Sequence, residues 1–232
     1  MHKIIRKALG KLNIAIALML VIVMAGGLGG ATYVLASGTS TFGQTIKAGS
    51  LATDIVDGTY ASVGSPSVTM NAVTFSFAYQ TATGSFGTAS QQIYVSNPDA
   101  ADAGWTLTVA PPATTNLWDS VGTDFDFNDS TAEAGDGADA DALGGQMTVN
   151  PSGATLAVGQ CNSCVVTNVT KGSSTAYVEG TTDSVTLLTA AAASDDIGDW
   201  TLQNVSISQT IPAEQPAATD YTIDMVLTVT AS

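Results

Sequence analysis

Regular alternation of apolar and polar residues constrains the fold of this chain more than any other feature. Four runs place apolar side chains at every second position, mostly with Thr, Ser or Asp between them. Successive side chains point to opposite faces of a strand, so each run predicts a strand with one buried and one solvated face. Short strands separated by Gly and Pro turns indicate an all-β, antiparallel, Greek-key-like β-sandwich. The runs are 73–79, 105–109, 205–208 and 221–230.

Charge divides the chain near residue 36. The chain has 232 residues and a formal net charge of −14, yet all 20 acidic residues follow residue 36. Only Lys47 and Lys171 oppose them there, so two bases against 20 acids give this part a charge of −18. It also lacks His and Arg. A His-based triad, an imidazole metal site and a basic nucleic-acid face are therefore excluded from it. We expect no enzymatic activity and no nucleic-acid partner.

The first 36 residues predict an exported protein. Basic residues precede an uncharged apolar stretch, 14–36, and Val34-Leu35-Ala36 favours cleavage before Ser37. We interpret residues 1–36 as a secretory signal peptide with an apolar helix. The alternative is an uncleaved anchor, because about 20 apolar residues cross a bilayer, and membrane contact would then involve only 14–36. Either way, residues 37–232 are expected to be one β-sandwich domain, secreted or associated with the cell surface.

Short motifs in residues 94–109 and 211–229 carry a resemblance to a known family. Tyr94-Val95-Ser96-Asn97 followed by Gly104-Trp105-Thr106-Leu107 resembles the first signature of the bacterial WxL-domain surface proteins. Within the chain, Asp199-Trp200-Thr201-Leu202 echoes Gly104-Trp105-Thr106-Leu107, and two core strands that each begin with a bulky residue would explain this echo without any function. The stretch 211–229 resembles the closing strand of the family, but Leu227-Thr228-Val229 stands where the family has its second Trp-x-Leu.

This resemblance implies an exported β-sandwich with a structural, adhesive or noncovalent wall-binding role. Its implied partners are a cell-wall polymer or other surface proteins. The residues that it implies for cell-surface binding are Trp105, Leu107, Trp200 and Leu202.

The start of the exported part is similar to a second family. Ala31-Thr32-Tyr33 and the stretch from Thr41 to Leu51 are similar to the mature start of camelysin-like matrix-fibre proteins. That resemblance implies a fibre-forming subunit that passes a terminal strand to the next subunit. Self-assembly is therefore the second functional interpretation. The acidic charge makes any association of copies dependent on salt or divalent cations.

An acidic loop at about residues 119–145 is the candidate metal site. It groups hard carboxylate oxygens as calcium requires, although the Gly and Glu positions of an EF-hand are missing. The alternative is a solvated acidic loop. A calcium-dependent carbohydrate-binding module is the third functional interpretation, with Ca²⁺ as its cofactor. Phe125 and Phe127 alternate with acids, which predicts a strand with Asp124 and Asp126 on its wet face. The candidate ligands are Asp124, Asp126, Asp129, Asp136, Asp139 and Asp141.

Cys161 and Cys164 are the only cysteines, and in an exported protein they predict a disulfide. A zinc site would need two more soft ligands. A thioredoxin-like redox site would need a helix after the first Cys, where residues 165–167 instead predict a strand. Closing so short a loop stabilises by about 2 kcal/mol, so the disulfide is expected to stiffen a turn. The acidic group at residues 195–199 is interpreted as another turn.

Overall fold

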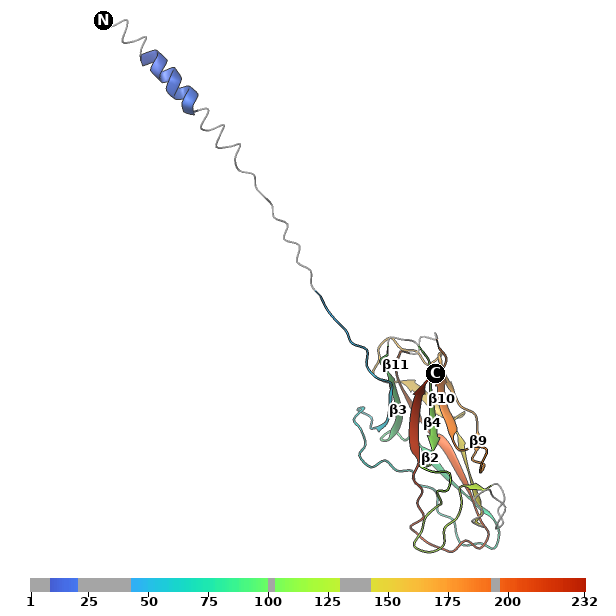
Figure 1. Ribbon diagram of the computed structural model, residues 1–232. Coiled ribbons are helices and arrows are strands. Elements are labelled where there is room, and N and C mark those ends of the chain that lie inside the picture. Colours follow the sequence, from blue (N-terminus) through green and yellow to red (C-terminus); the bar gives the residue numbers. More distant parts are fainter. Residues whose placement is uncertain (1–8, 21–42, 100–102, 130–142, 193–196) are drawn as a thin grey trace, which may run out of the picture. The chain divides into compact units, whose positions relative to one another are not determined.

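The computed structural model describes residues 9–20, 43–99, 103–129, 143–192 and 197–232 (Figure 1). The chain divides into two compact units, Met1–Ile46 and Lys47–Ser232. In the first unit, residues 9–20 form a helix. No helix in the described ranges is both long and apolar enough to cross a membrane. Residues 21–36 lie outside the described residues, so the predicted leader remains a prediction.

The unit Lys47–Ser232 confirms the all-β prediction (Figure 1). Its described residues form thirteen strands in three sheets, and every paired strand runs antiparallel to its neighbour. The strands are β1 Ala52–Val56, β2 Gln80–Phe86, β3 Gln92–Asn97, β4 Trp105–Ala110, β5 Asn128–Asp129, β6 Gly145–Asn150, β7 Thr155–Val158, β8 Val169–Lys171, β9 Thr175–Ala176, β10 Val185–Ala190, β11 Gly198–Gln203, β12 Val205–Ile211 and β13 Val226–Ala231.

Two of the sheets are joined end to end. One has the order β1-β3-β11-β7 and the other the order β2-β12-β6-β5, with β9 paired to β6. The chain passes from β11 to β12 through a single residue, and from β2 to β3 and from β6 to β7 through short turns, so three strands of one sheet lead into three strands of the other. Together they form one long bent layer.

The bend depends on backbone conformations that few residues adopt. Gly87, between β2 and β3, has a φ of +84°, and a Cβ there would lie 2.7 Å from the carbonyl oxygen of Leu202. Asn204, between β11 and β12, has a φ of 62°, and its N–H donates to the Gly87 carbonyl at 2.7 Å. Glycine and asparagine tolerate this left-handed region best, so both residues suit the junction.

The third sheet, in the order β13-β4-β10-β8, forms the opposing layer of a β-sandwich-like fold. Buried side chains of the three sheets belong to one apolar core. Trp105 on β4 and Trp200 on β11 meet there, with ring centroids 5.4 Å apart. Tyr177, which follows β9, is also fully buried, and its hydroxyl donates to the carbonyl of Val109 on β4 at 2.8 Å.

Alternation in the sequence identifies some strands correctly and misplaces others. The runs at 105–109 and 205–208 are confirmed as β4 and β12. The run at 221–230 is a regular strand only from Val226 onward, because Thr222 pairs instead with Asp119 and leaves the ladder with β4. The run at 73–79 is not a strand, which corrects the sequence-based prediction. A strand needs a neighbouring edge as well as an alternating pattern.

Replacing Gly87 with Ala is expected to reduce the free energy of unfolding by about 1–3 kcal/mol. Alanine is strained at this positive φ, and its methyl group would also lie too close to the Leu202 carbonyl oxygen. Urea denaturation of the Lys47–Ser232 unit, which contains every strand and every core residue, measures the loss. Gly153→Ala is the control, because nothing lies within 4 Å of its Cβ position. Equal stability of the two variants would show that the junction between the sheets does not require glycine at position 87.

Stability is also expected to fall in alkaline solution. Burial raises the pKa of Tyr177, and burial together with the Asp199 carboxylate raises that of Tyr94. The folded protein therefore holds these phenolic protons more tightly than the unfolded chain does. Their stabilisation is complete below pH about 10 and is lost as pH rises through the folded pKa values. Denaturation across this range should show a smaller pH dependence for Tyr177→Phe; an identical slope would contradict the assignment.

Candidate functional site

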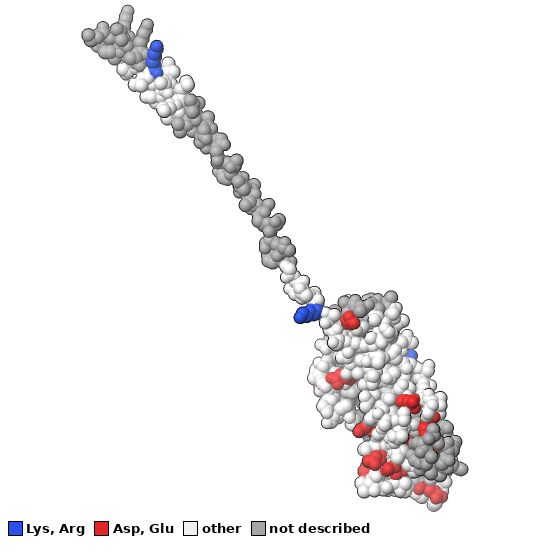
Figure 2. All heavy atoms as spheres, viewed as in Figure 1, with Lys and Arg blue, Asp and Glu red and all other residues white. Residues whose placement is uncertain are grey.

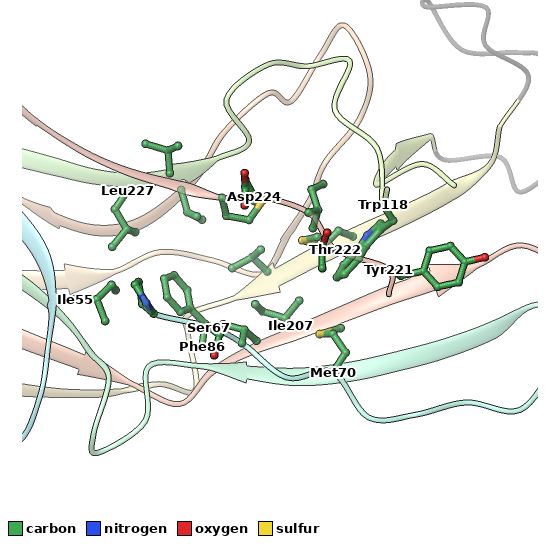
Figure 3. Close-up of a pocket in the computed structure, with 18 of the residues that line it drawn as sticks. Ile55, Ser67, Met70, Phe86, Trp118, Ile207, Tyr221, Thr222, Asp224 and Leu227 are labelled. Atoms are coloured by element: carbon green, nitrogen blue, oxygen red, sulfur yellow. The ribbon is translucent and has the colours of Figure 1, made fainter. Parts of the chain in front are cut away.

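An apolar groove opens between the two layers at the edge where β1 faces β13. Its volume is about 590 Å³ (Figure 3). Buried side chains from β4, β6 and β12 reach its interior, including Val109, Met147 and Ile207. Figure 3 shows the 221–227 segment along one side and Met70, Phe86 and Ile207 along the other. The groove therefore exposes part of the apolar core to solvent.

The walls of the groove are held by backbone pairing and by side-chain packing. On one side, Thr222 exchanges two backbone hydrogen bonds with Asp119, at 2.8 and 3.0 Å, and Ile223 and Met225 are half-buried against the core. On the other side, Val68 and Met70 pack on the core from a segment that pairs with β2 through a Met70–Gly84 bridge. The walls are connecting segments and a strand end, which leaves the groove open.

Polar residues gather at the rim of the groove. Thr53 and Asp54 come from β1, and Thr222 and Asp224 from the opposite wall. No Lys or Arg lines the groove in the described part of the chain. An apolar slot with an acidic rim suits an extended, uncharged or apolar ligand segment and repels anions.

A smaller polar pocket of about 370 Å³ adjoins the groove and shares Thr222, Ile223 and Asp224 with it. Asp119 and Asp124 also line it, and Asp124 accepts a hydrogen bond from the Ser120 N–H at 2.9 Å. The pocket therefore carries carboxylates from two segments that are far apart in the sequence.

The described calcium candidates do not gather into one site. Asp124 lines the polar pocket, Asp129 is buried in β5, and Asp126 is only 1% exposed. The Asp126 carboxylate accepts from the N–H groups of Phe127 and Asn128 at 2.6 and 3.2 Å. The predicted wet face is therefore wrong for Asp126. Asp136, Asp139 and Asp141 lie outside the described residues, so calcium binding by the loop stays a prediction.

All four residues that the WxL resemblance implies for surface binding are in the core. Trp105, Leu107, Trp200 and Leu202 are each 0% exposed. The Trp200 indole N–H donates to the Val165 carbonyl at 2.9 Å, so its polar atom is also used inside the fold. A polymer at the surface would not touch these side chains. Their predicted binding role stays a prediction, and they could serve it only by supporting the fold.

The predicted disulfide between Cys161 and Cys164 is confirmed, with the two Cα atoms 5.6 Å apart. Asp199 fastens the loop that contains it. The Asp199 carboxylate accepts from the N–H groups of Gln160 and Cys161 at 2.7 and 2.8 Å and from the Tyr94 hydroxyl at 2.9 Å. The sequence-based interpretation placed Asp199 in an acidic turn, whereas it is buried in β11. Its position directly before a core Trp was the available signal.

Cys161, Cys164 and Asp199 are also the one group of potential metal ligands found close together in the described ranges. The disulfide occupies both sulfur atoms, and the carboxylate is used by the loop. This arrangement serves the loop structure.

The groove itself was not predicted. It is formed by segments around residues 53–55, 66–70 and 221–227, which no local motif connects. No family model, curated protein or solved structure matches the chain.

Replacing Asp199 with Asn should lower the free energy of unfolding by about 1–3 kcal/mol, because an amide nitrogen cannot accept the hydrogen bonds that hold the disulfide loop. Removing the negative charge should also lower the pKa of Tyr94, although burial still keeps it raised. Urea denaturation and an ultraviolet pH titration measure the two effects. Asp183→Asn, at an exposed position, is the control and should change stability by less than about 0.5 kcal/mol. Equal free energies of unfolding for the two variants would exclude a stabilising role for the hydrogen bonds between Asp199 and the disulfide loop.

Proposed function

We propose that this chain is a non-enzymatic structural protein of the cell surface whose copies assemble by strand addition. The apolar groove carries the proposal, because it leaves core side chains accessible between two sheets of an otherwise well-packed fold. An extended segment from a second copy would cover these side chains and extend the adjoining sheet. Main-chain hydrogen bonds would then supply affinity, and alternate side chains in the groove would supply specificity.

The edge of β13 beside the groove supports this mode of assembly. β13 ends its sheet and pairs only with β4 among the described strands. β1 also ends a sheet, but its outer edge is partly taken by Ser62 and Val63. Edge strands present main-chain donors and acceptors that can template a further strand. Half-buried Ile223, Met225 and Leu227 line the groove beside this edge. A docked segment would therefore gain both backbone pairing and apolar burial.

The sequence supports a location outside the cell. The basic and apolar leader and the predicted, observed disulfide both suit export. The proposal accordingly includes a cleaved signal peptide and a Greek-key-like order of strands in the sandwich. Absence of His and Arg from residues 37–232 leaves little side-chain chemistry for catalysis but does not hinder assembly.

Wall binding is the alternative that follows from the WxL resemblance. It lacks support from direct contacts, because Trp105 and Trp200 are fully buried. Strand addition is supported by a groove of suitable polarity and by the sheet edge at β13. We therefore favour assembly over polymer binding as the activity of the described surface.

Strand addition predicts that the full chain forms elongated polymers visible by negative-stain microscopy and by sedimentation. Ile223→Asp should reduce polymer formation by about tenfold or more, because it places a carboxylate in the apolar groove. Val165→Asp is the matched control: it adds the same charge at a side chain that is 43% exposed and outside the groove. Circular dichroism melting verifies that both variants fold.

Ionic strength offers a second readout in the same experiment. Copies that each carry −18 on residues 37–232 repel one another, so added salt should increase polymer mass until the repulsion is screened. A wild-type chain that stays monomeric at every salt and calcium concentration would exclude the proposed function. Equal polymer formation by Ile223→Asp and the wild type would exclude the groove as the assembly site.

A further inference from the structure

A second feature lies next to the groove: residues 71–79 expose a row of large apolar side chains. Val73 is 39% exposed, Phe75 47%, Phe77 79% and Tyr79 47%. They occupy every second position, and the rings of Phe75 and Phe77 meet edge to face at 5.3 Å. Side chains of this size seldom remain exposed in a contiguous row unless a partner covers them.

The segment has the composition of a strand but lacks strand pairing within its own copy. Val, Thr, Phe and Tyr favour strands, yet residues 71–79 are outside every strand of the fold. Its attachments to the rest of the fold include the Asn71 N–H, which donates to the Thr83 carbonyl at 2.7 Å, and the Ser76 carbonyl, which accepts from the Glu214 N–H at 2.8 Å. The segment is thus held in place on the surface, outside the strands of the fold.

Charge makes this region the most suitable for contact between copies. From Gly58 to Pro98 the chain contains no Asp, Glu, Lys, Arg or His, although residues 37–232 carry −18 overall. Figure 2 shows how acidic side chains are distributed over one face of Lys47–Ser232, with large areas free of charge. Two copies that meet through an uncharged segment avoid much of their mutual repulsion. The same uncharged stretch supplies Val68 and Met70 to the groove wall.

We propose that residues 73–79 of one copy dock in the apolar groove of a second copy. This inference rests on the proposed function and names the segment that the groove receives. In an extended conformation the four apolar side chains would lie along one face over about 20 Å. They would enter a groove lined by Ile55, Ile223 and Leu227, beside the edge of β13.

The alternative segment of this chain fits less well. Residues 43–50, which precede β1, are exposed, but they contain only one large apolar side chain, Ile46. Residues 73–79 contain four at the spacing that a strand requires. The segment and the groove are different surfaces of the same molecule. Each copy would therefore insert its segment into one neighbour and accept the segment of another neighbour in its groove. Such a heterologous contact propagates into an open polymer unless its rotation closes a ring.

Cysteine cross-linking tests the docking directly. The Lys47–Ser232 unit contains the segment, the groove and the whole core, and both native cysteines are in a disulfide. Phe77→Cys is mixed with Asp224→Cys, which places the second thiol at the groove rim. Mild oxidation should give a mixed disulfide dimer in at least about tenfold excess over a mixture of Phe77→Cys with Val121→Cys. Val121 is 97% exposed and lies outside the groove, so it controls for random collision.

Loss of polymer provides the second readout. In the full chain, Phe75→Ser with Phe77→Ser should reduce polymer formation by about tenfold or more without lowering the melting temperature, since both side chains are exposed in the single copy. Val121→Ser with Val165→Ser removes two exposed apolar side chains elsewhere and should leave polymer formation unchanged.

The outcomes separate this inference from the proposed function. If Ile223→Asp prevents assembly while the double Phe variant assembles normally and no mixed cross-link forms, the groove receives another segment, and the inference is wrong while the function stands. If Phe77→Cys cross-links to itself and not to Asp224→Cys, the aromatic segments pair with each other and the inference is wrong. If neither groove nor segment variants affect assembly, both proposals are wrong.

Discussion

Contact between Trp105 and Trp200 determines how the two layers of the fold are spaced. Their rings meet at 5.4 Å and bury both side chains completely. β4 begins at Trp105 and ends near Val109, which lines the groove. The two rings therefore fill the end of the sandwich at which β4 begins, and the groove lies toward its other end, where Phe86, Trp118 and Tyr221 line it. At this end the large rings line the groove and do not close it.

The loop around the disulfide completes the filled end. Its Val165 carbonyl accepts the Trp200 indole N–H, and the buried Asp199 carboxylate holds the N–H groups of Gln160 and Cys161. A charged group inside the fold is acceptable here because it receives several hydrogen bonds. Two neighbouring residues of β11 thus connect the core to the disulfide loop: Trp200 through its indole N–H and Asp199 through its carboxylate.

Sequence reasoning was sufficient for features that depend on local pattern. It predicted the all-β class, β4, β12 and the disulfide, because side-chain alternation and cysteine spacing are local properties. It did not predict that 73–79 lacks strand pairing, or that Asp199 is buried, because both depend on which distant segments are adjacent. The groove also depends on distant segments, since its walls come from opposite ends of the Lys47–Ser232 unit. A groove between two layers cannot be predicted from local sequence patterns.

Pairing of both cysteines and the absence of His from residues 37–232 together remove nearly every group that titrates near neutrality. Carboxylates ordinarily change charge near pH 4, and Lys and Tyr near pH 10, which leaves the terminal amine as the exception between them. Residues 37–232 therefore contain no side chain whose ordinary pKa lies near neutrality, so their net charge is almost constant from mildly acidic to mildly alkaline solution. Over that range, repulsion between these charges depends little on pH and mainly on the concentration of salt ions around the protein.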